Sequence, residues 1–181
     1  MRTPTLRVAA VILMALAYGA STSAAAPLDD PEVRALMTSE HRHVRAVDKR
    51  MSDAIADGLR RSTTFAHLVL ALDRSDVIVY IETAPRMPSS LSGRMLIVAA
   101  SAGQRYLRIQ IAAVPRGNEL VALVGHELQH ALEVAQAPDV RDEKSLIALY
   151  QAIGHEGQGG HRYDTIAAQD TGRQVRTELI G

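Results

Sequence analysis

The chain has 181 residues, and its 20 Lys and Arg residues balance its 20 Asp and Glu residues, so the formal net charge is zero. This balance, together with the absence of Trp and a single Phe, argues against a basic, base-stacking surface for nucleic acid or a basic patch for anionic membrane. The absence of Cys excludes disulfides and a lipoprotein anchor. The fold must therefore be stabilised by its apolar core or by a metal.

The N-terminus has the pattern of a secretory signal peptide. Arg2 and Arg7 precede an apolar run over residues 8–18, and small residues follow this run. Eleven apolar residues are too few to span a bilayer, which requires about 20. We expect a signal at residues 1–25, with an uncleaved anchor as the alternative, and a single domain at residues 26–181. The mature protein is then secreted or periplasmic and has no membrane span.

The first part of the mature chain is predicted to be helical. From residue 31 to about residue 61 only Gly58 interrupts the helical pattern, and apolar residues recur at helical spacing. These residues are Val44, Val47, Met51, Ile55 and Leu59. The apolar segment from Phe65 to Leu72 fits either the end of a helix or the start of a strand, because periodicity alone does not distinguish them.

Three strands are predicted next. Residues 77–82 are β-branched and aromatic, a Pro- and Ser-rich loop follows, and residues 95–100 form a second apolar run. Residues 106–111 alternate between polar and apolar side chains, which is typical of a half-buried or edge strand. We therefore expect a three-stranded sheet.

Helices complete the predicted domain. Asn118 is the expected N-cap of an amphipathic helix that continues to about Gln136, before Pro138. Residues 146–153 predict a short helix, and residues 164–179 predict the last one. The sequence therefore indicates one α+β domain with N-terminal helices, a sheet and C-terminal helices.

The amphipathic helix carries an HExxH motif, HELQH, at residues 126–130. His126 and His130 are one helical turn apart, so both imidazoles can reach one metal ion. Glu127 lies about 100° further round the helix, where its carboxylate can reach a water on that metal without being a ligand. This spacing is typical of metal-assisted hydrolysis.

The rest of this helix separates an apolar face from a polar one. The apolar residues recur at three- and four-residue steps, and they are Val121, Val124, Leu128, Leu132 and Ala135. The pattern predicts that this stripe packs into the core, while His126, His130 and Glu133 lie on an open face. The alternative is a surface helix whose two His residues are solvated.

The order of these elements resembles that of the zincin metallopeptidases, particularly small gluzincin-like members. The resemblance covers residues 65–179 as an order of elements and residues 126–130 as a motif. It implies that His126 and His130 bind Zn²⁺ and that Glu127 is the general base. It also implies that an extended peptide substrate pairs with the strand before the motif helix, here Arg105 to Ala112.

The family also implies a third metal ligand from a downstream helix. Gluzincins commonly present Glu-x-x-Ala there, whereas this chain has Asp164-Thr165-Ile166-Ala167-Ala168. Asp164 is the first choice, since Asp binds zinc at ordinary oxygen distances, and Glu133 is an alternative that contacts the metal or orients a ligand. The remaining alternatives are His161, His155 and Glu143.

The expected function is that of an exported zinc-dependent hydrolase, foremost a peptidase. Glu127 would take a proton from water during attack on the carbonyl and pass it to the leaving nitrogen. One alternative is a zincin-like zinc-binding domain with a structural or interaction role and no hydrolytic activity. A remote alternative is a helical di-iron protein, because Glu40-x-x-His43 and Glu127-x-x-His130 give two Glu/His pairs.

Overall fold

The computed structural model describes residues 30–39, 42–101, 103–154 and 164–181. Over these residues the chain is α+β, with six helices and a four-stranded mixed sheet, so the predicted α+β class is confirmed. The expected signal peptide at residues 1–25 lies outside the described residues. None of the helices in the described ranges is both long and apolar enough to cross a membrane.

The described elements follow one another in this order: α1 (Pro31–Thr38), β1 (Val44–Ala46), α2 (Lys49–Arg61), α3 (Thr63–Asp73), β2 (Val77–Ala84), β3 (Gly93–Ser101), β4 (Gln104–Ala112), α4 (Gly117–Ala135), α5 (Glu143–Ile153) and α6 (Ile166–Ile180).

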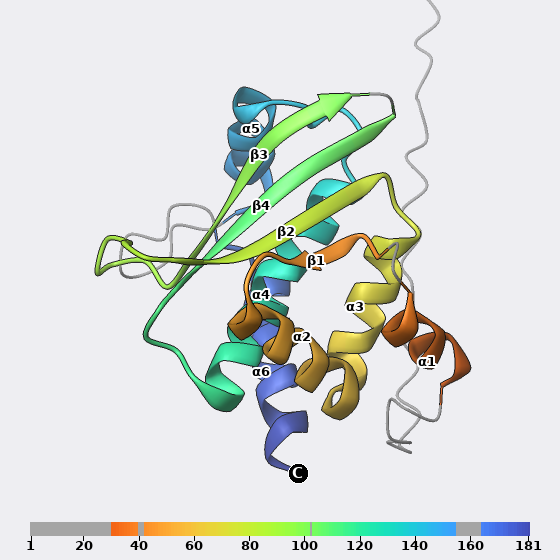
Figure 1. Ribbon diagram of the computed structural model, residues 1–181. Helices are drawn as coiled ribbons and strands as arrows, with labels where there is room; N and C mark the ends of the chain where they lie inside the picture. The colour runs from red at the N-terminus through yellow and green to blue at the C-terminus, as the bar shows by residue number, and fades with distance from the viewer. Residues whose placement is uncertain (1–29, 40–41, 102, 155–163) are drawn as a thin grey trace, which may run out of the picture.

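The sheet has the strand order β1-β2-β4-β3 (Figure 1). Strands β1, β2 and β4 are parallel to one another, and β3 is antiparallel to β4. The prediction of three strands was wrong by one, because β1 falls in a stretch that was assigned to helix. Its three residues are held by parallel pairing with residues 79–81 of β2, a long-range contact that local periodicity does not reveal.

The strand from Arg105 to Ala112 is not an edge. Strand β4 pairs with β2 along one side and with β3 along the other, so its backbone N–H and C=O groups already form hydrogen bonds with neighbouring strands. The expected pairing of a peptide with Arg105 to Ala112 is therefore corrected: the edge next to this strand is β3. The alternation in β4 reflects one buried face, where Leu107, Ile109 and Ile111 lie, and this pattern occurs in interior as well as edge strands.

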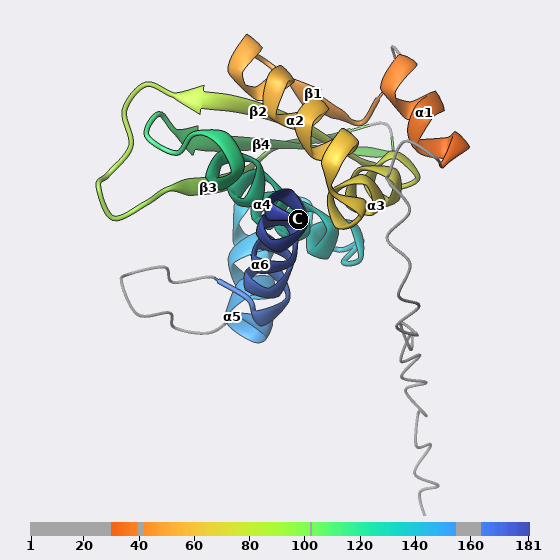
Figure 2. The ribbon, with the colours of Figure 1, turned by 90° about the horizontal axis from the view of Figure 1, so that it is seen from below.

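Helix α4 is at the centre of the helical layer. It packs against α2, α3 and α6 and against three strands of the sheet, and these helices all lie on one side of the sheet (Figures 1 and 2). The ambiguous segment 65–72 is part of helix α3, whose N-cap Ser62 accepts a hydrogen bond from the Phe65 amide. The fully buried residues at the centre of this layer are Met51, Leu59, Phe65, Val69, Leu72, Val124 and Leu128.

A buried arginine fixes the C-terminal end of α4 to the sheet. Arg105 of β4 is fully buried and forms a bidentate ion pair with Asp76, with N···O distances of 2.8 Å and 2.6 Å. Its guanidinium also donates to the carbonyl oxygens of Val134 and Ala137, each at 2.7 Å. Carbonyls at a helix C-terminus lack partners within the helix and carry partial negative charge. Arg105 supplies hydrogen-bond donors and a positive charge to these carbonyls, and so fixes the position of α4.

Candidate metal centre

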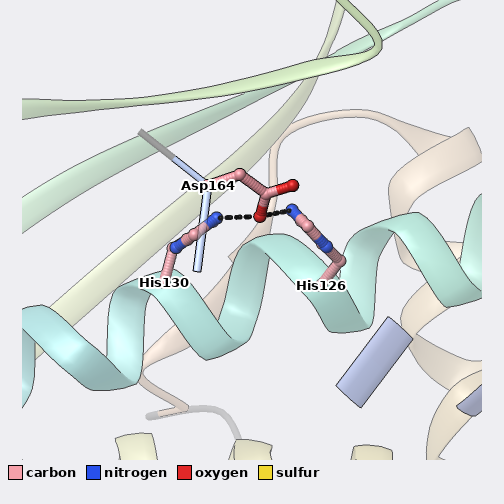
Figure 3. A group of neighbouring side chains, drawn as sticks. All are labelled: His126, His130 and Asp164. Carbon is pink, nitrogen blue, oxygen red and sulfur yellow. Dashed lines mark ion pairs between the residues drawn. The ribbon is translucent and has the colours of Figure 1, made fainter. Parts of the chain in front are cut away.

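Three predicted ligands lie together in the structure. Figure 3 shows the Asp164 carboxylate between the two imidazole rings. Its Oδ1 atom lies 3.5 Å from His126 Nε2 and 3.7 Å from His130 Nε2. Ligand atoms of all three residues lie within 4.8 Å of one another. The motif helix and the segment before α6 therefore meet at one cluster of two nitrogens and one oxygen.

These separations fit a divalent metal ion. Ligand atoms about 2.0–2.2 Å from a tetrahedral zinc ion are about 3.3–3.6 Å from each other, which is close to the two distances measured here. Two imidazoles and a carboxylate suit zinc and also other divalent transition metals. Three protein ligands leave a fourth position for water or substrate, as in catalytic zinc sites.

Helix α4 positions the two rings, α6 packs against His126, and Tyr150 of α5 packs against His130. The ring centroids of His126 and His130 are 4.9 Å apart, with an interplanar angle of 83°. A Cβ atom at Gly172 of α6 would lie 3.2 Å from His126 Cβ, so this glycine permits the close approach of the helices. The expectation of an open face was wrong, since His130 and Glu133 are only 6% and 8% exposed.

Asp164 precedes α6 rather than starting it. Thr165 is the N-cap and the helix begins at Ile166, so the predicted helix start at residue 164 was two residues early. The Asp164 carboxylate accepts hydrogen bonds from the Thr165 amide at 2.8 Å and from Gln169 Nε2 at 3.0 Å. These contacts orient the carboxylate from its own side of the cluster.

The other proposed third ligands are not in this cluster. Glu143 is exposed in the first turn of α5. Glu133 faces the opposite ring nitrogen of His130, with Oε2 at 2.9 Å from Nδ1, so it contacts a ligand rather than the cluster. His155 and His161 lie outside the described residues.

Glu127 is placed beside the cluster without being part of it. The residue is only 6% exposed, and no hydrogen bond to its carboxylate occurs among the described residues. A Cβ atom at Gly93, the first residue of β3, would lie 2.2 Å from Glu127 Oε1, so a larger residue here would displace this carboxylate from its observed position. Burial raises the pKa of Glu127 to about 7, with a further rise from Asp164 that His130 opposes.

The three candidate ligands shift one another's pKa values. Burial alone would lower the pKa of His130, but the carboxylates of Asp164 and Glu133 outweigh it and raise the pKa to about 9. Burial and the neighbouring His130 lower the pKa of His126. For Asp164, burial opposes the ionised form, but interactions with His130, Gln169 and His126 outweigh it and hold the pKa at about 2.

Three residues of the site were not predicted from the sequence: Gly93, Thr165 and Gln169. Tyr150 of α5 donates a hydrogen bond to the His130 carbonyl oxygen at 3.1 Å. The preference of Thr for N-caps is a signal that could have identified Thr165. Gly93 and Gln169 are brought to the site by packing between elements and carry no local signal.

Searches against protein-family models, curated proteins and solved structures found no match to this chain. The interpretation of the site therefore depends on the chemistry and geometry of its own residues.

Proposed function

We propose that this protein is an exported, zincin-like, zinc-dependent hydrolase that cleaves peptide bonds. One observation carries the proposal: Glu127 is only 6% exposed, its carboxylate accepts no hydrogen bond in the described part of the chain, and it lies beside the His126, His130 and Asp164 cluster. A carboxylate without a protein partner remains available to other groups that enter the site. This arrangement, together with a raised pKa, is typical of a group whose partner is a substrate or a reacting water.

The side chains divide the chemistry among them. His126, His130 and Asp164 would hold the metal. Bound zinc would supply a Lewis acid that polarises a carbonyl oxygen and acidifies water. Glu127 accepts the proton of the attacking water and then donates it to the leaving nitrogen. A pKa of about 7 suits a group that must both take and release a proton near neutral pH.

The edge strand β3 supports an extended peptide as substrate. It is paired with β4 on one side only, and its first residue, Gly93, contacts Glu127. A peptide paired with the outer side of β3 would therefore pass the proposed general base. This edge replaces the strand from Arg105 to Ala112 as the proposed place of substrate pairing.

A cavity next to His126 supports the same proposal. It has a volume of about 470 Å³ and continues from His126 between α4 and α6. The apolar part of its wall is formed by Val114, Pro115, Ala122 and Leu123, while Glu119, Arg173 and Arg176 contribute charged groups. We propose that it receives an apolar side chain of the substrate next to the scissile bond.

Export is supported by the sequence pattern of residues 1–25. The helical di-iron alternative has little support, because the described residues include a four-stranded sheet and the Nδ1 atom of His43 lies 3.1 Å from the Leu72 carbonyl oxygen. Glu40 lies outside the described residues.

The test is cleavage of a mixed peptide library by the purified protein, followed by mass spectrometry. We expect cleavage that a chelator abolishes and added zinc restores. Glu127→Gln should lose turnover and retain bound zinc, because Glu127 is not a ligand. Glu143→Gln, an exposed glutamate on α5, is the matched control and should retain turnover.

Two results would refute the proposed hydrolase. One is turnover by Glu127→Gln at the wild-type rate. The other is a zinc-loaded wild-type protein that cleaves no member of the library, which would favour the alternative of a zinc-binding domain with a structural or interaction role.

A further inference from the structure

A buried carboxylate connects the motif helix to the segment that carries the third ligand. Glu133 Oε2 lies 2.9 Å from His130 Nδ1, and Glu133 Oε1 accepts a hydrogen bond of 2.6 Å from Thr165 Oγ1. All three residues are buried, at 8%, 6% and 4% exposure. A solvated glutamate on a helix surface makes no such contacts, so this one has a defined role within the fold.

We infer that Glu133 is a positioning residue that holds His130 and the Asp164–Thr165 segment in register for one metal ion. This inference depends on the metal centre of the proposed function, but it does not depend on hydrolysis. Neither carboxylate oxygen of Glu133 needs to contact the metal. The two oxygens act through a ligand on α4 and through the N-cap of α6.

The contact with His130 determines which ring nitrogen faces the metal. Imidazole that donates its Nδ1 proton presents the Nε2 lone pair. His130 Nε2 is the nitrogen that faces Asp164, at 3.7 Å. A carboxylate on the far nitrogen also fixes the ring orientation and makes it a stronger ligand, and losing such a partner typically weakens metal affinity 10–100-fold.

Through its contact with Thr165, Glu133 also positions Asp164. Thr165 Oγ1 donates to Glu133 and accepts from the Ala168 amide at 3.1 Å, so one hydroxyl both caps α6 and attaches its start to α4. Asp164 is the preceding residue, and its carboxylate accepts from the Thr165 amide. Displacing Thr165 would therefore move the third ligand relative to the two imidazoles.

The test measures zinc affinity by competition with a chromophoric chelator in otherwise intact protein. Glu133→Ala and Thr165→Val should each weaken zinc binding about 10–100-fold. Because both substitutions break one shared connection, the double variant should lose much less than the product of the two effects. Thr165→Ser retains the hydroxyl and should bind zinc within about twofold of wild type.

The matched control is Asp48→Ala, which removes the N-cap of α2 far along the chain from the cluster. It should lower the melting temperature, as loss of a cap does, and leave zinc affinity within about twofold of wild type. A role in general stability alone predicts instead that affinity falls in this control as well.

Nitrogen-15 NMR of the histidine side chains supplies a second readout. Zinc-loaded wild type should show His130 with a protonated Nδ1 and a metal-bound Nε2, whereas Glu133→Ala should show altered or mixed ring states. If Glu133→Ala does not fold, Glu133→Gln and Thr165→Val provide the same comparison.

Wild-type affinity in the folded Glu133 and Thr165 variants would refute the positioning role. Additive losses in the double variant would refute the shared connection. Absence of hydrolysis would overturn the proposed activity and leave these affinities unchanged, whereas absence of zinc binding by wild type would overturn both.

Discussion

The substitution Arg105→Met tests whether the buried arginine anchors the motif helix. The Arg105 side chain is fully buried, but the Asp76 side chain is 35% exposed. Arg105→Met therefore leaves this carboxylate in contact with water, and its main cost is the buried carbonyl oxygens that lose their donor, at about 1–3 kcal/mol each. Here the loss includes both hydrogen bonds to Asp76 and those to the carbonyl oxygens at the end of α4. Methionine fills much of the volume of the arginine side chain, so the loss of stability comes from the missing hydrogen bonds and charge and not from a cavity. We expect a loss of about 3–5 kcal/mol in unfolding free energy, which for a domain of this size lowers the melting temperature by about 6–20 °C.

The assay is urea unfolding followed by circular dichroism, with Arg108→Met as the control on the same strand. Arg108 lies on the exposed face of β4, and its side chain, 47% exposed, is 4.0 Å from Glu82. A surface pair of this kind contributes about 0–1 kcal/mol. The reasoning is refuted if Arg105→Met unfolds within about 1 kcal/mol of wild type, or if both variants lose the same free energy.

The same pair predicts a dependence on pH. The hydrogen bond from Arg105 holds the pKa of Asp76 below its ordinary value, with burial acting in the opposite direction. A carboxyl whose pKa is depressed by folding stabilises the protein above its unfolded pKa, and this stabilisation is lost as the pH falls through the folded pKa. The difference in stability between wild type and Arg105→Met should therefore narrow below pH 4.

Three further predictions concern the metal centre. Asp164→Ala should weaken zinc binding more than Glu133→Ala does, as measured by chelator competition. Asp170→Ala, on the exposed face of α6, should leave zinc binding unchanged. Equal zinc affinity in these three variants would remove Asp164 from the ligand set. Gly93→Ala should reduce turnover with zinc retained, because the added Cβ would displace the Glu127 carboxylate, and full activity of this variant would contradict the close contact. Because the pKa of His130 is about 9 before metal binds, zinc must displace its proton at pH 7, so affinity should rise about tenfold per pH unit up to that value. Calorimetry in buffers of different ionisation enthalpy would detect the released proton, and affinity independent of pH would be the contrary result.

Several features of the fold could be predicted from local patterns. The alternation in residues 106–111 and the apolar runs 77–82 and 95–100 all correspond to strands. The helical spacing around residues 126–130 corresponds to α4. These assignments succeed because each pattern reports the environment of consecutive residues, which a single element determines by its own repeat.

Other predictions failed where the outcome depended on a distant partner. Asn118 was expected to cap α4, but its side chain donates to the Leu179 carbonyl oxygen of α6, and α4 has no side-chain cap. The polar face of α4 was expected to be open, but His130 packs against Tyr150 of α5, and Glu133 contacts Thr165 at the start of α6. In both cases, contacts with helices further along the chain decided the environment.

The sequence by itself determined the α+β class and the helix that carries HELQH. It also determined that His126 and His130 lie on one side of this helix with Glu127 beside them, because i and i+4 spacing on a helix is a local property. Only the tertiary structure decided that Asp164 meets both rings, that Glu133 links His130 to Thr165, and that β3 rather than β4 is the sheet edge. These contacts join residues far apart in the chain. They follow from which faces pack together, and packing minimises the free energy of the whole domain rather than of any one segment.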